Sequence, residues 1–191
     1  MSQTVKDVLD FVKDNDVKFV ILTFCDSFGN IKNISLVADE LPSAFEKGVS
    51  FEAYSVGGFV DPRESDLVLY PDASTIQLLP WRLQHGSVVR FFCKIRHTDG
   101  RSFDGDGRGM LFRAQNKLSE MGYSCQIGSD CEFYLFRLDS EGEPTLIPHD
   151  RGGYLDAAPF DKGENVRRDI CLTLEKLGIK PISSHHERGP G

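Results

Sequence analysis

Two carboxylates stand two positions apart in an otherwise apolar run of the sequence. Asp130 and Glu132 alternate with Cys131 and Phe133 in a segment that is predicted to be a strand. Side chains at i and i+2 project from the same face of a strand, so we expect both carboxylates to point together. Such a pair is costly in apolar surroundings unless a cation or a basic partner neutralises it. Hard oxygen ligands at this spacing suit Mg²⁺ or Mn²⁺, and a solvated sheet edge is the alternative explanation.

A second polar cluster follows the strand that is predicted at Lys180 to Ser184. It consists of His185, His186 and Glu187, and in an extended chain His185 and Glu187 share one face. The string lacks the H-E-x-x-H spacing of a helical zinc site, so a plain surface turn is an alternative. If the strands that lead into the two clusters are neighbours, they could present three carboxylates to one metal. No Walker-type or G-x-G-x-x-G loop accompanies these clusters.

The elements of the first half are predicted from hydrophobic periodicity. A helix is expected from Thr4 to Asn15, with Thr4 as its N-cap. Strand-like runs follow at Val17 to Cys25, Ile31 to Val37, Leu67 to Tyr70, Thr75 to Leu79, and Ser87 to Ile95. The first two are expected to form a hairpin, because residues 26–30 are turn formers and Gly29 adopts a positive φ at no steric cost.

The hydrophobic period changes near residue 104, after a turn-rich segment. A helix is predicted from Met110 until Gly122 ends it, and a second from about Lys162 to Leu177 until Gly178 ends it. Between the helices we expect a strand over residues 124–138, interrupted at 128–129, and a loop over residues 139–153.

Composition restricts the class of protein. The chain has 191 residues, 22 Lys and Arg against 29 Asp and Glu, and a formal net charge of −7, which suits one globular domain or two small ones. The acidic excess repels a polyanion, so nucleic-acid binding is not expected. The longest apolar stretch, Val17 to Phe24, is far shorter than the roughly 20 residues of a membrane-spanning helix. No membrane association is therefore expected, and the absence of a signal-peptide pattern at the N-terminus favours a cytoplasmic location.

Cysteine usage agrees with a reducing compartment. The five cysteines are odd in number and form no C-x-x-C pair. Most stand in apolar segments, so we expect buried, reduced thiols that pack as small apolar side chains. A nucleophilic cysteine with a histidine partner is the alternative.

Four ordered motifs resemble the glutamine synthetase family over nearly the whole chain. Residues 64–75 (ESDLVLYPDAST) resemble that family's E-S-D-x-x-L-x-P-D-x-S-T segment. Residues 128–133 (GSDCEF) resemble its G-x-E-x-E-F metal strand. The G-G-Y at 152–154 with the P-x-D at 159–161 resembles its loop before a helix, and residues 185–191 (HHERGPG) resemble the start of its H-H-E-x-x-P-G-Q motif.

The resemblance implies an α+β fold in two parts. A β-grasp-like N-terminal domain is expected at residues 1–103, and the beginning of the glutamine synthetase catalytic domain, incomplete, at residues 104–191. In this family ATP phosphorylates glutamate to γ-glutamyl phosphate, and ammonia then displaces the phosphate. The implied partners are glutamate, ammonia and ATP, in a homo-oligomer with active sites between subunits.

The resemblance also implies a metal site, since divalent cations neutralise phosphoryl charge in such a reaction. By position, Glu132 and Glu187 are ligands of one Mg²⁺ or Mn²⁺ ion, and Asp130 holds a second. Asp130 stands where the family usually has Glu, a side chain that is one methylene longer.

Residues 51–58 (FEAYSVGG) align with the family's F-D-G-S-S-x-x-G loop, which reaches into the neighbouring subunit's active site. The resemblance makes Glu52 and Ser55 candidate catalytic residues. Glu52 replaces an Asp that helps to bind and deprotonate ammonium, and Tyr54 replaces a Ser. A γ-glutamyl ligase for a larger amine is therefore one alternative, and a loop that packs its phenylalanines into the core is another.

The ending at Gly-Pro-Gly is typical of a chain that turns toward a further element. The family's remaining catalytic segments, with another Glu ligand, a metal-binding His and phosphate-binding Arg residues, are expected beyond Gly191. We therefore expect that the chain as given does not complete the reaction alone. The alternative is a short, non-catalytic relative that associates with full-length subunits.

Overall fold

The structure is a computed structural model that describes residues 4–59, 66–81 and 86–191. The first two residues of the motif at 64–75 thus lie outside the described residues. The chain divides into two compact units, an N-terminal unit at Met1–Gln126 and a C-terminal unit at Ile127–Gly191. The domain boundary predicted at residue 103 falls inside the N-terminal unit and stays a prediction. Within the described ranges no helix is long and apolar enough to span a bilayer.

The predicted N-terminal helix is confirmed. α1 (Val5–Asp14) begins with a capping box, in which Thr4 Oγ1 accepts a hydrogen bond from the Asp7 backbone N–H at 3.2 Å. The Asp7 carboxylate accepts one in return from the Thr4 backbone N–H at 2.9 Å. These bonds satisfy N–H groups that the first helical turn leaves without partners. The helix buries Val8 and Val12 in the core.

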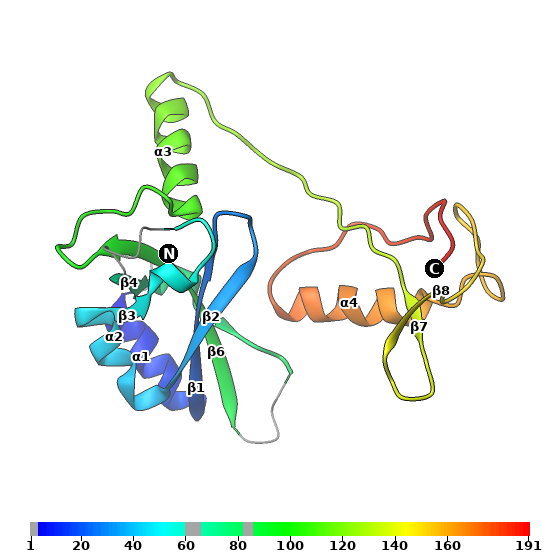
Figure 1. Ribbon diagram of the computed structural model, residues 1–191, viewed down its shortest axis with the longest axis horizontal. Coiled ribbons are helices and arrows are strands. Elements are labelled where there is room, and N and C mark those ends of the chain that lie inside the picture. The colour runs from blue at the N-terminus through cyan, green and yellow to red at the C-terminus, as the bar shows by residue number, and fades with distance from the viewer. Residues whose placement is uncertain (1–3, 60–65, 82–85) are drawn as a thin grey trace. The chain divides into compact units, whose positions relative to one another are not determined.

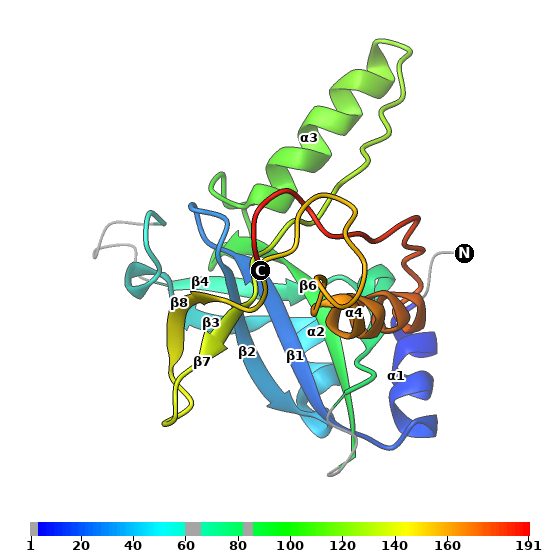
Figure 2. The same cartoon turned by 90° about the vertical axis from the view of Figure 1, so that its right-hand side faces the viewer.

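Six strands form the sheet of the N-terminal unit, in the order β2-β1-β6-β4-β3, with β5 also paired to β6. Their bounds are β1 (Val17–Cys25), β2 (Ile31–Val37), β3 (Val49–Glu52), β4 (Asp66–Pro71), β5 (Gln77–Leu78) and β6 (Ser87–His97). Figure 2 shows β1 between β2 and β6, antiparallel to the first and parallel to the second. α1 and α2 (Leu41–Lys47) lie together on one face of this sheet (Figure 1). The result is the mixed sheet with helices on one side that the α+β prediction requires.

The predicted β1–β2 hairpin is confirmed, and Asp26 organises its turn. The Asp26 carboxylate accepts hydrogen bonds from the backbone N–H groups of Phe28 at 2.9 Å and Asn30 at 2.8 Å. Gly29 has a φ of 83°, in the region that favours glycine. The turn therefore fixes the register in which Cys25 pairs with Ile31.

The core lies between the sheet and the two helices. β6 buries every second side chain, namely Val89, Phe91, Cys93 and Ile95, as the period of a half-buried strand requires. Hydrophobic periodicity does not predict α2, because its seven residues complete only about two turns. The run predicted as a strand at Thr75–Leu79 is also shorter than expected, because a 3₁₀ turn at Ala73–Thr75 takes its first residue.

The next helix, α3 (Gly107–Glu120), is confirmed and begins at the core of the N-terminal unit. Its N-cap, Asp106, accepts hydrogen bonds from the backbone N–H groups of Arg108 at 3.1 Å and Ile95 at 3.2 Å. One carboxylate thus caps the helix and ties it to β6. Gly122 follows the helix with a φ of 82°, which ends it as predicted.

The C-terminal unit contains a hairpin and a helix. β7 (Phe136–Leu138) pairs antiparallel with β8 (Pro144–Pro148), and α4 (Glu164–Lys176) ends before Gly178, whose φ is 75°. The predicted second helix is therefore confirmed. The prediction of a loop over residues 139–153 is wrong for residues 144–148, which form β8.

Two predicted strands of this half are wrong. Residues 124–135 are irregular, so only the last three residues of the predicted strand at 124–138 are extended and paired. The segment at 180–184 is also irregular. A strand needs a neighbour for its backbone hydrogen bonds, and within the described residues the sheets contain no partner for either segment.

The cysteine prediction is confirmed only in part. All five thiols are free, and Cys93 is buried in the core. Burial is the main reason that the pKa of Cys93 is raised to about 12. Cys125 and Cys131 are exposed, contrary to the prediction, because the irregular segment that carries them is not covered.

Candidate functional site

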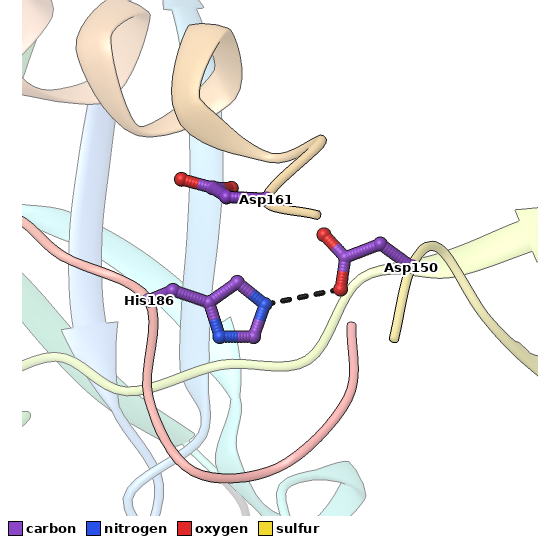
Figure 3. A group of neighbouring side chains, drawn as sticks. All are labelled: Asp150, Asp161 and His186. Carbon is purple, nitrogen blue, oxygen red and sulfur yellow. Dashed lines mark hydrogen bonds and ion pairs between the residues drawn. The ribbon is translucent and has the colours of Figure 1, made fainter. Parts of the chain in front are cut away.

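Three ionisable side chains lie buried together in the C-terminal unit. Asp150, Asp161 and His186 are 3%, 6% and 4% exposed, and one potential ligand atom from each lies within 4.8 Å of the others. Figure 3 shows the Asp150 carboxylate directed at the ring of His186, with Asp161 beside them. The sequence did not predict this cluster, because its members come from three separate loops.

Asp150 follows β8 and holds four hydrogen-bond donors. Its Oδ1 accepts from the backbone N–H groups of Gly152 and Gly191, both at 3.1 Å, and from His186 Nε2 at 3.0 Å. Its Oδ2 accepts from the backbone N–H of Lys162 at 2.8 Å. Burial alone raises the pKa of a carboxyl group, but these donors outweigh it and hold the pKa of Asp150 far below its usual range.

His186 makes one hydrogen bond from each ring nitrogen. Nδ1 lies 2.6 Å from the carbonyl oxygen of Glu187, and Nε2 lies 3.0 Å from Asp150 Oδ1. A carbonyl and an ionised carboxylate only accept hydrogen bonds, so both ring nitrogens must carry protons. The Glu187 carbonyl first, and Asp150 second, raise the pKa of His186. We therefore assign this side chain as a buried imidazolium.

Asp161 precedes α4 and binds the guanidinium of Arg167, which lies in the first turn of that helix. Arg167 Nη1 lies 3.1 Å from Oδ1 and Nη2 lies 2.5 Å from Oδ2, a two-point pairing of the strong kind. The hydrogen bonds from Arg167 are the main reason that the pKa of Asp161 is lowered. The backbone N–H of Gly163 donates to the same carboxylate at 2.9 Å.

The cluster is neutral overall and leaves no ring nitrogen for a metal. Two carboxylates balance the imidazolium of His186 and the guanidinium of Arg167. A histidine binds a metal through an unprotonated nitrogen, and both nitrogens of His186 are engaged as donors. The network therefore fixes the backbone around it and is not itself a cation site.

The predicted metal ligands lie outside this network. Asp130 and Glu132 are exposed on the irregular segment, and no hydrogen bond or ion pair engages either carboxylate within the described residues. Glu187 is also exposed, and its Oε1 lies 3.5 Å from His185 Nδ1. Because residues 124–135 are not a strand, the argument that Asp130 and Glu132 share a strand face does not hold.

The structure nevertheless brings the two predicted segments together. The Leu135 backbone N–H donates to the Gly191 carbonyl oxygen at 2.7 Å. A Cβ atom on Gly189 would lie only 2.6 Å from the Tyr134 hydroxyl, so this glycine allows a close approach. The segment that bears Glu132 is thus joined to the segment that bears Glu187. Among the described residues, however, these carboxylates do not converge within 4.8 Å as a group of three.

The candidate catalytic residues of the N-terminal unit contact each other. Glu52 ends β3, Ser55 lies in the 3₁₀ turn that follows, and Ser55 Oγ donates to Glu52 Oε2 at 2.5 Å. Both side chains are exposed. Phe51 and Phe59, on either side, pack against the core, with ring centroids 5.0 and 6.2 Å from that of Phe24. The loop therefore packs inward through its phenylalanines and presents its polar groups outward.

Comparisons with known proteins agree with the sequence motifs. The family described as "Glutamine synthetase, beta-Grasp domain" matches residues 16–98, and "Glutamine synthetase, catalytic domain" matches residues 104–191. A glutamine synthetase of Clostridium saccharobutylicum is 42% identical over 98% of this chain, and one of Methanosarcina mazei is 44% identical over 98%. The chain covers 42% of the length of each of these relatives.

A likeness in fold accompanies the likeness in sequence. The solved structure of Plasmodium falciparum glutamine synthetase matches with a TM-score of 0.77 at 17% identity. The match covers 98% of this chain and 43% of that one.

Proposed function

This chain belongs to the glutamine synthetase family, and we propose that it takes part in the ATP-dependent ligation of ammonia to glutamate through γ-glutamyl phosphate. It contributes the β-grasp domain, to about residue 103, and part of the catalytic domain. Because the chain covers 42% of the relatives' length, we propose that it supplies part of the active site and does not complete the reaction alone.

The contact between Leu135 and Gly191 is the observation that carries this proposal. It ties together the two acidic segments, although Glu132 and Glu187 are 55 residues apart in the sequence. Between them they offer three exposed carboxylates, two of which have no protein partner within the described residues. Uncommitted carboxylate oxygens are the ligands that Mg²⁺ and Mn²⁺ prefer, so the donor set fits a divalent cation.

In the proposed site, Glu132 and Glu187 hold one cation and Asp130 holds the second. A bound divalent cation neutralises the negative charge of the phosphates of ATP during phosphoryl transfer. The short Asp130 side chain reaches less far than a Glu, so we expect the second site to be the weaker of the two.

Glu52 and Ser55 serve the amine step in this proposal. A carboxylate that faces solvent can attract ammonium and accept its proton, and the 2.5 Å hydrogen bond from Ser55 fixes the direction of the Glu52 carboxylate. We propose that this outward-facing loop completes the active site of a neighbouring subunit in a homo-oligomer.

A chimera tests the amine step in an active enzyme. Residues 51–58 of this chain replace the matching loop of a catalytically active glutamine synthetase, and glutamine formation is followed with ammonium as the amine. Retained glutamine synthesis, lost on Glu52→Ala in the chimera, supports the role of Glu52. Full activity after Glu52→Ala argues against it.

A larger amine is the second candidate substrate, because Glu52 and the exposed Tyr54 stand where the family has Asp and Ser. The same chimera is assayed with methylamine and ethylamine beside ammonium. A gain in kcat/KM for either alkylamine relative to ammonium supports this candidate, and an unchanged preference for ammonium rejects it.

A mixing experiment distinguishes a chain that is part of an enzyme from a short, non-catalytic relative that associates with full-length subunits. The purified chain is added to an active glutamine synthetase, and the mass of the assembly and its activity are both followed. Incorporation of the chain with a change in activity supports the regulatory alternative. An unchanged mass and rate rejects it.

A further inference from the structure

We propose that Asp150 and His186 are positioning residues, which hold the segment that bears Glu187 in the orientation needed for metal binding. The inference rests on the proposed function, because it assigns a task to side chains that lie behind a proposed ligand. Neither residue touches the metal or the substrate in this proposal. Each acts through the backbone on either side of Glu187.

His186 forms the first link. Its ring lies between Asp150 Oδ1 and the carbonyl oxygen of Glu187, at 3.0 and 2.6 Å. The second bond fixes the plane of the peptide that follows Glu187. Rotation of that peptide would break a hydrogen bond to a buried ring, which is costly away from water.

Asp150 forms the second link, to the far end of the same segment. Asp150 Oδ1, which accepts the hydrogen bond from His186 Nε2, also accepts one from the backbone N–H of Gly191 at 3.1 Å. Glu187 therefore lies within a short loop of chain that is anchored to one carboxylate at both ends. The Gly191 carbonyl in turn accepts the Leu135 N–H, so the same anchor places this loop against the segment that bears Glu132.

Close packing leaves this arrangement little freedom. The side chains of Asp150 and His186 are 1% and 4% exposed. A Cβ atom on Gly152 would lie 2.9 Å from His186 Nε2, so the ring packs directly on the glycine backbone. The buried pair therefore cannot shift without disturbing the backbone on both sides.

Groups behind metal ligands commonly have this effect. Partners that orient a ligand typically change metal affinity by about 10- to 100-fold when they are removed. Here the oriented ligand is an exposed carboxylate, and the orienting groups are a buried pair of hydrogen-bonded side chains. Among the described residues, the Glu187 carboxylate has one side-chain partner, His185, whose Nδ1 lies 3.5 Å from Oε1. The backbone on either side is therefore the main means by which the protein orients Glu187.

Two substitutions of His186 separate the links. A Gln side chain can place its amide N–H where Nε2 stands and donate to Asp150, whereas an Asn can donate in place of Nδ1 to the Glu187 carbonyl. The full 191-residue chain is prepared with the wild-type sequence, with His186→Gln and with His186→Asn. Asp139→Asn is the matched control, because Asp139 accepts two backbone N–H groups in the β7–β8 turn and has no bond to the Glu187 segment.

Mn²⁺ affinity, measured by titration calorimetry, is compared with the melting temperature of each variant. His186→Gln is expected to keep most of the melting temperature and to bind Mn²⁺ about tenfold more weakly, since it keeps the Asp150 link and loses the Glu187 link. His186→Asn is expected to lose melting temperature and to bind Mn²⁺ more tightly than His186→Gln. An affinity that simply follows the melting temperature across the variants overturns the positioning role.

Amide hydrogen exchange at Gly191 gives a readout that needs no metal, because this N–H donates to Asp150 Oδ1. Faster exchange in His186→Asn, which loses the Asp150 link, with little change in His186→Gln and in the Asp139→Asn control, supports the anchor. Unchanged exchange overturns it. If the wild-type chain binds no Mn²⁺ while exchange responds as expected, the metal-binding part of the proposed function fails and the anchor stands.

Discussion

Arg108 Nη2 lies 3.0 Å from Asp72 Oδ2, and this ion pair joins the first turn of α3 to the end of β4. The Arg108 guanidinium also lies 5.5 Å from the centroid of the Phe92 ring on β6. Helix and sheet are thus linked by a charge contact and an aromatic contact, in addition to the Asp106 cap. These links explain why α3 belongs to the N-terminal compact unit, although hydrophobic periodicity places a boundary before it.

Removal of this link is expected to loosen α3. Arg108→Met keeps much of the apolar stem and removes the charge. The side chains of the pair are only 27% and 13% exposed, so the charged hydrogen bond is worth about 1.5–3 kcal/mol. Backbone amides of α3 should exchange faster, while those of β6 stay protected. Lys117→Met, which removes an exposed charge from the last turn of the same helix, is the control. Equal exchange in both variants would contradict the role of Arg108.

The Asp161–Arg167 pair is expected to make the C-terminal unit sensitive to acid. The folded-state pKa of Asp161 is lowered, so its contribution is fully present above the unfolded value of about 3.9 and is lost as pH falls through the folded value. Asp161→Asn leaves the partly buried guanidinium of Arg167 with a neutral partner and should lower the free energy of unfolding near pH 7 by about 1.5–3 kcal/mol. Urea unfolding at pH 7 and below pH 4 measures both effects. A variant that loses as much stability as wild type on acidification would falsify this assignment.

Two glycines with similar positive φ values are expected to differ in their tolerance of alanine. Gly29 and Gly48 have φ values of 83° and 73°, which strain any residue with a side chain, and the ψ of −179° at Gly48 places it in a region that is essentially open only to glycine. A Cβ on Gly29 meets nothing within 4 Å, whereas one on Gly48 would lie 2.3 Å from Val68 Cγ1 and 3.0 Å from the Leu69 carbonyl. Gly48→Ala should therefore lower the free energy of unfolding by about 1–3 kcal/mol more than Gly29→Ala does. Thermal unfolding of both variants tests this, and equal losses would show that strain alone decides.

Thiol labelling is expected to separate the cysteines by position. Cys125 and Cys131 are exposed and should react with a maleimide in the native chain at pH 7. Cys93 is buried and its pKa is raised to about 12, so it should react only after unfolding. Mass spectrometry of labelled peptides, with and without urea, measures this order. Early labelling of Cys93 would mean that the core opens locally.

Loss of either proposed ligand is expected to weaken metal binding. Glu132→Gln and Glu187→Gln remove the charge with little change of shape, and each should reduce the Mn²⁺ affinity of the chain by about tenfold or more. Glu141→Gln, in the exposed β7–β8 turn of the same unit, controls for a general loss of negative charge. Calorimetric titration compares the three. Equal affinities would remove these residues from the metal site.

The sequence by itself determined the local elements and the family. The α1 helix with its Thr4 cap, the β1–β2 hairpin with Gly29, and the helix ends at Gly122 and Gly178 all follow from short-range rules, because capping and positive φ depend on a few neighbouring residues. The ordered motifs identified the glutamine synthetase family and the α+β fold class, which the comparisons and the architecture confirm.

Tertiary structure decided whether apolar segments became strands and which polar groups met. Residues 124–135 have a strand-like pattern, but a strand forms only beside a partner, and none of the described residues supplies one. Asp150, Asp161 and His186 are separated by loops of no fixed period, so no local rule could place them within 4.8 Å. Their meeting depends on the fold of the whole C-terminal unit, because only burial makes an unpaired charge costly enough to require a partner.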